Sequence, residues 1–261
     1  MKSASKRTRI TVLGLFKQAV VWMFSLVYMP ILIIICLIVS RQRRSSLGPL
    51  MTRGWGHSVL CLAGVKVNYT DEAREALSKR TARVLTFNHG STLDVLLGAS
   101  LLPNGGVLAL KAEMRTMPIL GRGAVALGSI FLDRANRESA YATLRESAQR
   151  IQAETLQVLI APEGTRSDDG QLGRFKLGAF HLADEAQVPI LPIVLHGATE
   201  IWPRSRLAPL RGAVTIDVLP EFLVSGETPE SIRISADRLR ELYLATLTTP
   251  ATASTKGTGT T

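Results

Sequence analysis

Two short polar segments carry the residue types that could do chemistry in this sequence. Residues 88–94 read Asn-His-Gly-Ser-Thr-Leu-Asp, and residues 162–167 read Pro-Glu-Gly-Thr-Arg-Ser. Each segment follows an apolar, strand-like run, at residues 84–87 and 158–161. Ligands bind at the carboxyl ends of the strands in open α/β sheets. Both segments are therefore candidates for a ligand site.

In the first segment, His89 and Asp94 form a candidate acid–base pair. An imidazole accepts a proton near neutral pH, because its unperturbed pKa is about 6.5. A carboxylate that fixes the tautomer makes the imidazole a more effective base. The spacing fits if His89 lies in a turn and Asp94 in the first turn of a helix, with Ser91 or Thr92 as the N-cap. Such a dyad needs no nucleophilic Ser or Cys, because the hydroxyl of a substrate can attack. The alternative is a capped turn with a structural histidine.

In the second segment, Glu163, Gly164 and Arg166 suit an anionic or polyol ligand. Glycine lets the backbone approach a ligand closely, and the planar guanidinium of arginine matches a phosphate. Glu163 could orient a polyol hydroxyl or fix Arg166. The alternative is an ordinary strand-to-loop exit with a Glu–Arg pair on the surface.

Taken together, the two segments resemble the glycerolipid acyltransferase family, typified by the lysophosphatidate acyltransferases. Four blocks match in the family's order, between about residues 60 and 225. The blocks are residues 88–94; residues 111–134 with Lys111, Pro118, Gly121 and Arg134; residues 162–178 with Glu163, Arg166, Phe175, Lys176 and Gly178; and residues 188–194. One departure from the pattern is Ala161, where the family often has an aromatic residue; it concerns packing more than chemistry.

The resemblance implies direct transfer of an acyl chain from acyl-CoA or acyl-carrier protein to the sn-2 hydroxyl of 1-acyl-glycerol-3-phosphate. The product is phosphatidic acid, an intermediate of phospholipid biosynthesis. In this scheme His89 is the general base and Asp94 orients it, and neither a metal nor a resident cofactor is needed. Six residues are implied to bind substrate: Lys111, Arg134, Glu163, Gly164, Thr165 and Arg166.

Two alternatives to this function remain open. An acyltransferase with the same motifs could act on glycerol-3-phosphate or on another lysolipid such as lyso-ornithine lipid, because arginine binds a carboxylate as well as a phosphate. A membrane-anchored scaffold with a dead site is the non-enzyme alternative. The presence of His89, Asp94, Glu163 and Arg166 argues against that scaffold.

The N-terminal part of the sequence has the features of a membrane anchor. The first seventy residues hold all ten excess positive charges and no Asp or Glu, and these charges bracket an uncharged run at residues 18–40. Residues 19–39 are long enough to cross a bilayer core, which takes about 20 helical residues. Pro30 could instead produce a re-entrant hairpin, and an interfacial helix in one leaflet is a further alternative.

The orientation of this anchor does not follow from charge, because both of its flanks are basic. Acyl thioesters are cytosolic, so the catalytic domain is expected on the cytoplasmic face of the membrane, the inner membrane in a bacterium. The basic flanks would lie on anionic headgroups. Nucleic acid is not an expected partner, because the basic stretch contains no recognition motif.

The rest of the sequence alternates strands and helices, which predicts an α/β fold with a mostly parallel sheet flanked by helices. We expect an anchor at residues 1–58, a catalytic domain at residues 59–247 and a disordered tail at residues 248–261. Expected strands lie near residues 65–69, 83–87, 106–110, 128–132, 157–161, 189–195 and 213–219. Expected helices lie near residues 71–79, 92–102, 137–154, 174–187 and 229–247.

Overall fold

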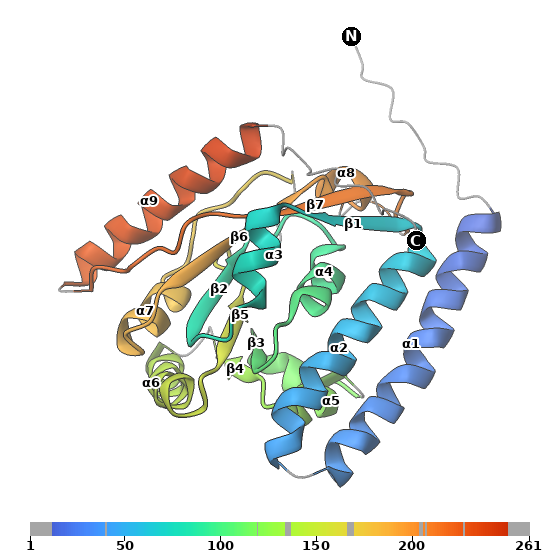
Figure 1. Cartoon of the computed structure of the whole chain (residues 1–261), viewed down its shortest axis with the longest axis horizontal. Coiled ribbons are helices and arrows are strands. Elements are labelled where there is room, and N and C mark those ends of the chain that lie inside the picture. Colours follow the sequence, from blue (N-terminus) through green and yellow to red (C-terminus); the bar gives the residue numbers. More distant parts are fainter. Residues whose placement is uncertain are drawn as a thin grey trace, which may run out of the picture.

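A seven-stranded sheet forms the centre of the protein (Figure 1). The computed structural model describes residues 12–39, 41–118, 120–133, 137–165, 170–203, 206, 208–226 and 228–249. The strands are β1 (Val65–Tyr69), β2 (Arg83–Phe87), β3 (Gly106–Lys111), β4 (Ile130–Leu132), β5 (Gln157–Ile160), β6 (Ile190–His196) and β7 (Gly212–Val218). They lie in the order β1-β7-β6-β2-β5-β3-β4, and only β6 and β7 are antiparallel. The predicted α/β fold with a mostly parallel sheet is confirmed.

The central strands are buried on both faces, which explains their nearly continuous apolar sequences. All five residues of β2 and all four of β5 are buried. In β6 only the last residue, His196, is partly exposed. The carboxyl ends of these three neighbouring strands lie at one edge of the sheet, because β2 is parallel to both β5 and β6.

Helices cover the two faces of the sheet and form two separate cores. One core contains side chains of α6 (Arg137–Glu154), α7 (Gly178–Glu185) and α9 (Pro229–Thr248). The other contains side chains of α2 (Arg41–Ala63), α3 (Asp71–Ser78), α4 (Asp94–Leu101) and α8 (Ala198–Ile201). Figure 1 shows the first group on the opposite side of the sheet from α2 and α4.

Helix α7 is shorter than the sequence predicts. It begins at Gly178, and residues 174–177 before it are not helical. In this short segment Phe175 is fully buried, whereas Arg174 and Lys176 are exposed. The backbone N–H of Lys176 donates a 2.7 Å hydrogen bond to the carbonyl oxygen of Pro162. The segment therefore lies beside the turn that follows β5.

Helices α2, η1 (Ala112–Thr116) and α5 (Leu120–Ala126) are present although no helix was predicted at these positions. Helix α2 extends across the expected boundary between the anchor (residues 1–58) and the catalytic domain (residues 59–247), and packs against α4. The predicted tail at residues 248–261 lies outside the described residues from residue 250 onward.

Helix α1 (Val12–Ile38) lies alongside α2, away from the sheet (Figure 1). One of its faces is held by the protein: Leu32 is buried against Ala126 of α5, and the Tyr28 hydroxyl donates a 2.9 Å hydrogen bond to the carbonyl oxygen of Met51. Within the described part of the chain, no helix has both the length and the apolar composition needed to cross a membrane. The predicted membrane-crossing span is therefore not supported.

Candidate active site

The turn after β2 carries His89 and is fastened to the neighbouring strand β6. The Asn88 side chain forms two hydrogen bonds with the backbone of Leu195: its Nδ2 donates to the carbonyl oxygen at 3.1 Å, and its Oδ1 accepts from the N–H at 2.8 Å. An amide side chain thus continues the pairing of the strands beyond the last residue of β2. This contact fixes where the following residue, His89, leaves the sheet.

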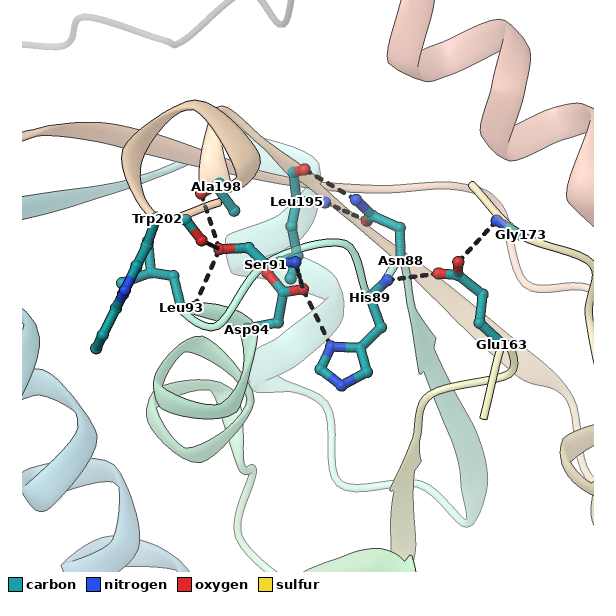
Figure 2. Close-up of polar contacts among 10 residues, drawn as sticks. All are labelled: Asn88, His89, Ser91, Leu93, Asp94, Glu163, Gly173, Leu195, Ala198 and Trp202. Atoms are coloured by element: carbon teal, nitrogen blue, oxygen red, sulfur yellow. Dashed lines mark hydrogen bonds and ion pairs between the residues drawn. The ribbon is translucent and has the colours of Figure 1, made fainter. Parts of the chain in front are cut away.

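His89 and Asp94 form the pair that the sequence predicts. The distance from His89 Nδ1 to Asp94 Oδ2 is 3.1 Å, and the backbone N–H of Ser91 donates to the same oxygen at 2.7 Å. The Asp94 side chain is 1% exposed and that of His89 is 16% exposed. Figure 2 shows the second ring nitrogen of His89 directed away from Asp94.

Burial raises the pKa of Asp94, and hydrogen bonds to His89 and to the backbone of Ser91 and Gly90 oppose this rise. These hydrogen bonds favour the ionised carboxylate, whereas desolvation penalises it. The hydrogen bonds that stabilise the Asp94 carboxylate thus come from His89 and from the backbone of the same turn. With Nδ1–H donating to this carboxylate, the neutral imidazole keeps Nε2 as a proton acceptor.

The predicted N-cap at Ser91 or Thr92 was wrong. Helix α4 begins at Asp94, and Leu93 occupies the cap position without a side-chain hydrogen bond. The hydroxyl of Ser91 instead accepts from the N–H of Leu93 at 3.0 Å. The same hydroxyl lies 2.9 Å and 2.7 Å from the carbonyl oxygens of Ala198 and Trp202. The Ser91 side chain therefore connects the turn to α8 and does not cap α4.

Glu163 lies on the other side of His89 and is 4% exposed. Its Oε1 accepts from the backbone N–H of His89 at 2.6 Å, and its Oε2 accepts from the N–H of Gly173 at 2.7 Å (Figure 2). Burial raises the pKa of Glu163, and the two backbone hydrogen bonds oppose this rise. The sequence suggested a carboxylate that orients a polyol or pairs with Arg166. In the structure, each of its oxygens binds a backbone N–H group.

The remaining predicted binding residues have different positions. Gly164 follows Glu163 with a φ of 76°, a left-handed conformation that favours glycine. Thr165 is exposed, and Lys111 is exposed at the carboxyl end of β3. Arg134 and Arg166 lie outside the described residues. The structure therefore brings His89, Asp94, Glu163 and Gly164 to the edge formed by β2 and β5, with Lys111 two strands from β2.

Gly173 is a site residue that sequence reasoning missed. A Cβ atom at this position would lie 3.1 Å from Oε2 of Glu163. A side chain here would require the carboxylate to shift by a few tenths of an ångström, so glycine allows the closest approach. The available signal was a glycine shortly before the Phe175-Lys176-x-Gly178 block, and that signal alone does not identify its partner.

The site contains no cluster typical of metal binding among the residues that the structure describes. In that part of the chain, no group of three or more His, Cys, Asp or Glu side chains is placed to hold an ion. What the arrangement offers is a partly exposed imidazole, backed by one buried carboxylate through its ring and by a second through its backbone. This combination can remove a proton from a hydroxyl group.

Comparison with known proteins gives a consistent family. Residues 67–196 match a family model described as Acyltransferase. Human 1-acyl-sn-glycerol-3-phosphate acyltransferase alpha is 35% identical over 161 residues, which are 62% of this chain and 57% of the human protein. A 1-acyl-sn-glycerol-3-phosphate acyltransferase of Limnanthes alba is 30% identical over 216 residues, covering 83% of this chain and 75% of the plant protein. The matched region is thus less than two thirds of the human protein's length.

The fold is also shared with a solved structure. The crystal structure of PlsC from Thermotoga maritima, a 1-acyl-sn-glycerophosphate (LPA) acyltransferase, matches with a TM-score of 0.74 and 21% identity. The match covers 92% of this chain and 98% of the other. With the family model and the plant relative, this similarity leads to one conclusion. The chain belongs to the acyltransferase family that includes these 1-acyl-sn-glycerol-3-phosphate acyltransferases.

Proposed function

We propose that this protein is an O-acyltransferase that moves an acyl chain from a thioester to the sn-2 hydroxyl of 1-acyl-glycerol-3-phosphate, giving phosphatidic acid. The observation that carries the proposal is the His89–Asp94 pair, held at 3.1 Å at the carboxyl edge of β2. The names of the human and Limnanthes relatives support the choice of acceptor.

In the proposed reaction, His89 Nε2 accepts the proton of the acceptor hydroxyl. The oxygen attacks the thioester carbonyl and forms the new C–O bond, and the resulting tetrahedral intermediate then collapses with cleavage of the C–S bond. The imidazolium returns its proton to the departing thiolate. Asp94 stabilises the imidazolium while it exists, and backbone N–H groups or water stabilise the oxyanion.

We assign the acceptor phosphate to basic residues of the matching sequence blocks. Lys111 is the described candidate, and Arg134 and Arg166 are candidates from the sequence blocks. Gly164 and Thr165 would offer backbone and hydroxyl contacts to the same phosphate. Glu163 supports this site indirectly, since both its oxygens bind backbone N–H groups.

We also propose that α1 lies on the membrane as an interfacial helix. Several of its apolar side chains are exposed and recur at intervals of three or four residues, which places them on one face. They are Met23, Val27, Ile31, Ile34 and Ile38. An apolar stripe of this kind can enter the boundary between headgroups and acyl chains. Because acyl thioesters are cytosolic, the catalytic domain is proposed to lie on the cytoplasmic face.

The decisive experiment is an acyl-transfer assay in detergent with acyl-CoA and acyl-carrier protein offered separately. The acceptors are lysophosphatidate, glycerol-3-phosphate and lyso-ornithine lipid, and a folded His89→Ala protein is the control. Transfer to lysophosphatidate that disappears in the variant supports the proposal. Transfer only to another acceptor keeps the mechanism and replaces the substrate. If no acceptor is acylated, the result favours the scaffold alternative.

A further inference from the structure

The C-terminal helix α9 forms hydrogen bonds with the short segment that contacts Glu163, residues 172–175. Arg240 donates from Nε to the carbonyl oxygen of Gly173 and from Nη2 to that of Leu172, both at 2.8 Å. Arg233, two turns earlier, donates from both terminal nitrogens to the carbonyl oxygen of Phe175 at 3.0 Å. The two arginines thus donate hydrogen bonds to three backbone carbonyl groups of one short segment, those of Leu172, Gly173 and Phe175.

Helix α9 is itself fixed to the strand that leads to His89. Tyr243 is fully buried, and its hydroxyl lies 3.0 Å from Oγ1 of Thr86 in β2. Its ring packs edge-on against Phe175, with 5.5 Å between the ring centroids. Arg240 therefore projects from a helix that cannot shift easily relative to β2, because a buried side chain one turn away is locked in the core.

One peptide group connects Arg240 to Glu163. The carbonyl of Leu172 and the N–H of Gly173 belong to the same peptide unit: the oxygen accepts from Arg240, and the N–H donates to Glu163 Oε2 at 2.7 Å. A cation at one end and a carboxylate at the other polarise this peptide in the same sense, which strengthens both hydrogen bonds. The other oxygen of Glu163 then holds the N–H of His89 at 2.6 Å.

The same segment touches the His89 turn at a second point. A Cβ atom on Gly90 would lie 3.1 Å from the carbonyl oxygen of Gly170. The backbone three residues before Gly173 thus also lies close to the turn that carries the imidazole. Moving this segment would move the backbone of His89 or remove its hydrogen-bond partner.

We propose that Arg240 is a positioning residue for acyl transfer: it fixes the Leu172–Gly173 peptide, which orients Glu163, which holds the backbone of His89. The inference rests on the proposed function, because it assumes that His89 is the base. Arg240 touches no reacting atom and acts only through this chain of contacts. Arginine suits the task because its planar fork binds two carbonyl oxygens at once, which the single ammonium of lysine does not reproduce.

The test compares Arg240→Ala, Arg240→Lys and Glu163→Gln with a matched control, Arg238→Ala. Arg238 lies on the same helix but is exposed and has no side-chain partner among the described residues. Because small displacements of a catalytic group are costly, we expect Arg240→Ala to lower kcat about ten-fold and Arg240→Lys by less, with KM for the lysolipid unchanged. Arg238→Ala should match the wild type.

A double-mutant cycle separates positioning from a general loss of stability. In Glu163→Gln, the amide turns an NH2 donor toward one of the two backbone N–H groups, so the link is already broken. Adding Arg240→Ala should then lower kcat less than two-fold further. Independent effects that multiply, or an Arg240→Ala protein with wild-type kcat, would overturn the inference.

Hydrogen exchange gives a readout that does not depend on activity. In Arg240→Ala the amides of residues 172–175 and of His89 should exchange at least several-fold faster, while amides of the β5 interior stay protected. Unchanged exchange in both segments would contradict the inference even if turnover fell. An inactive wild type would instead count against the proposed function. If Arg240→Ala does not fold, Arg240→Lys carries the same cycle and the same exchange measurement.

Discussion

Two regions of the molecule depart from the usual distribution of side chains. The edge of the sheet around His89 buries carboxylates, whereas the outer face of α1 exposes apolar side chains. At the first, the carboxylates of Asp94 and Glu163 are 1% and 4% exposed. At the second, Val27 and Ile38 are 64% and 79% exposed. Charged side chains are seldom fully buried, and extended apolar patches are seldom left on a surface. Both features lower the free energy of unfolding, so we expect each of them to serve a function.

The two regions differ in how that cost is met. The buried carboxylates accept hydrogen bonds from the ring of His89 and from the backbone N–H groups of Ser91, His89 and Gly173. The protein therefore compensates for them internally. For the apolar face of α1, no covering element exists among the described residues. The cost of the first region is thus offset within the protein, and the second is consistent with a partner outside the chain.

The largest expected effect tests whether the buried carboxylates serve His89. Replacing His89 with Ala removes the proposed base, so kcat/KM for acyl transfer should fall by about 10²–10⁴-fold. The variant should also be less stable, because Asp94 loses its 3.1 Å contact with the ring and Phe87 loses an edge-on neighbour, so turnover is compared per folded molecule. His57→Ala is a suitable control, since this histidine is exposed on α2. A folded His89→Ala protein with near-normal turnover would exclude the dyad mechanism.

Asp94→Asn should have the next largest effect and should separate activity from stability. The amide keeps an oxygen for the contacts at Oδ2 but cannot stabilise the imidazolium, so kcat should fall by about 10²-fold or more. Burial raises the pKa of Asp94 in the folded protein. Its ionisation therefore costs stability as pH rises from about 4, the unfolded value, through the folded value.

This linkage predicts a pH-dependent difference between the two proteins. Relative to wild type, Asp94→Asn should be more stable at pH 7, and the advantage should disappear below about pH 4, where Asp94 is protonated in both states. Chemical denaturation midpoints at the two pH values measure it. An advantage that is equal at both pH values would mean that the buried charge is not its source.

The sequence predicted the sheet and the His89–Asp94 contact because both depend on local patterns. All seven expected strands are present, and the His89–Asp94 spacing is short enough to be interpreted directly. The helix expected near residues 229–247 is present as α9, which begins at Pro229 with a capping box at Thr228. The partners of Glu163 could not be predicted in this way. They depend on a segment ten residues downstream, whose position is set by α9 packing from the far end of the chain.

The nature of α1 was predicted only in part for a related reason. Hydrophobicity indicates that residues 19–39 avoid water, but it does not state whether lipid or protein covers them. The contacts of Leu32 and Tyr28 with α5 and α2 are tertiary, and no pattern within the helix encodes them. The same limitation applies to Ser91, which contacts α8 more than a hundred residues away.

A smaller effect is expected from a charge on the exposed face of α1. Val27→Asp should weaken binding to vesicles of mixed anionic and neutral phospholipid by at least about ten-fold, since burying one such side chain contributes about 1.5–3 kcal/mol. In detergent, turnover should remain unchanged. Ile234→Asp is a matched control, because Ile234 is 60% exposed on α9, on the other side of the sheet. Equal losses for both variants would remove the special role of α1.

The smallest effect on activity is expected from a region that has neither the buried carboxylates nor the exposed apolar face. Thr70 caps α3 by accepting from the N–H of Ala73 at 3.1 Å, and its hydroxyl also donates to Asp217 at 3.0 Å. It lies at the end of β1, which runs parallel to β7 and opposite to β6, so it is at the edge of the sheet away from His89. Thr70→Ala should lower stability by about 1 kcal/mol and Thr70→Ser by less. Turnover per folded molecule should be unchanged in both, as measured by denaturation and by the transfer assay. A loss of turnover in Thr70→Ala that Thr70→Ser restores would show that function reaches beyond the carboxyl edge, and the contrast between the regions would have to be redrawn.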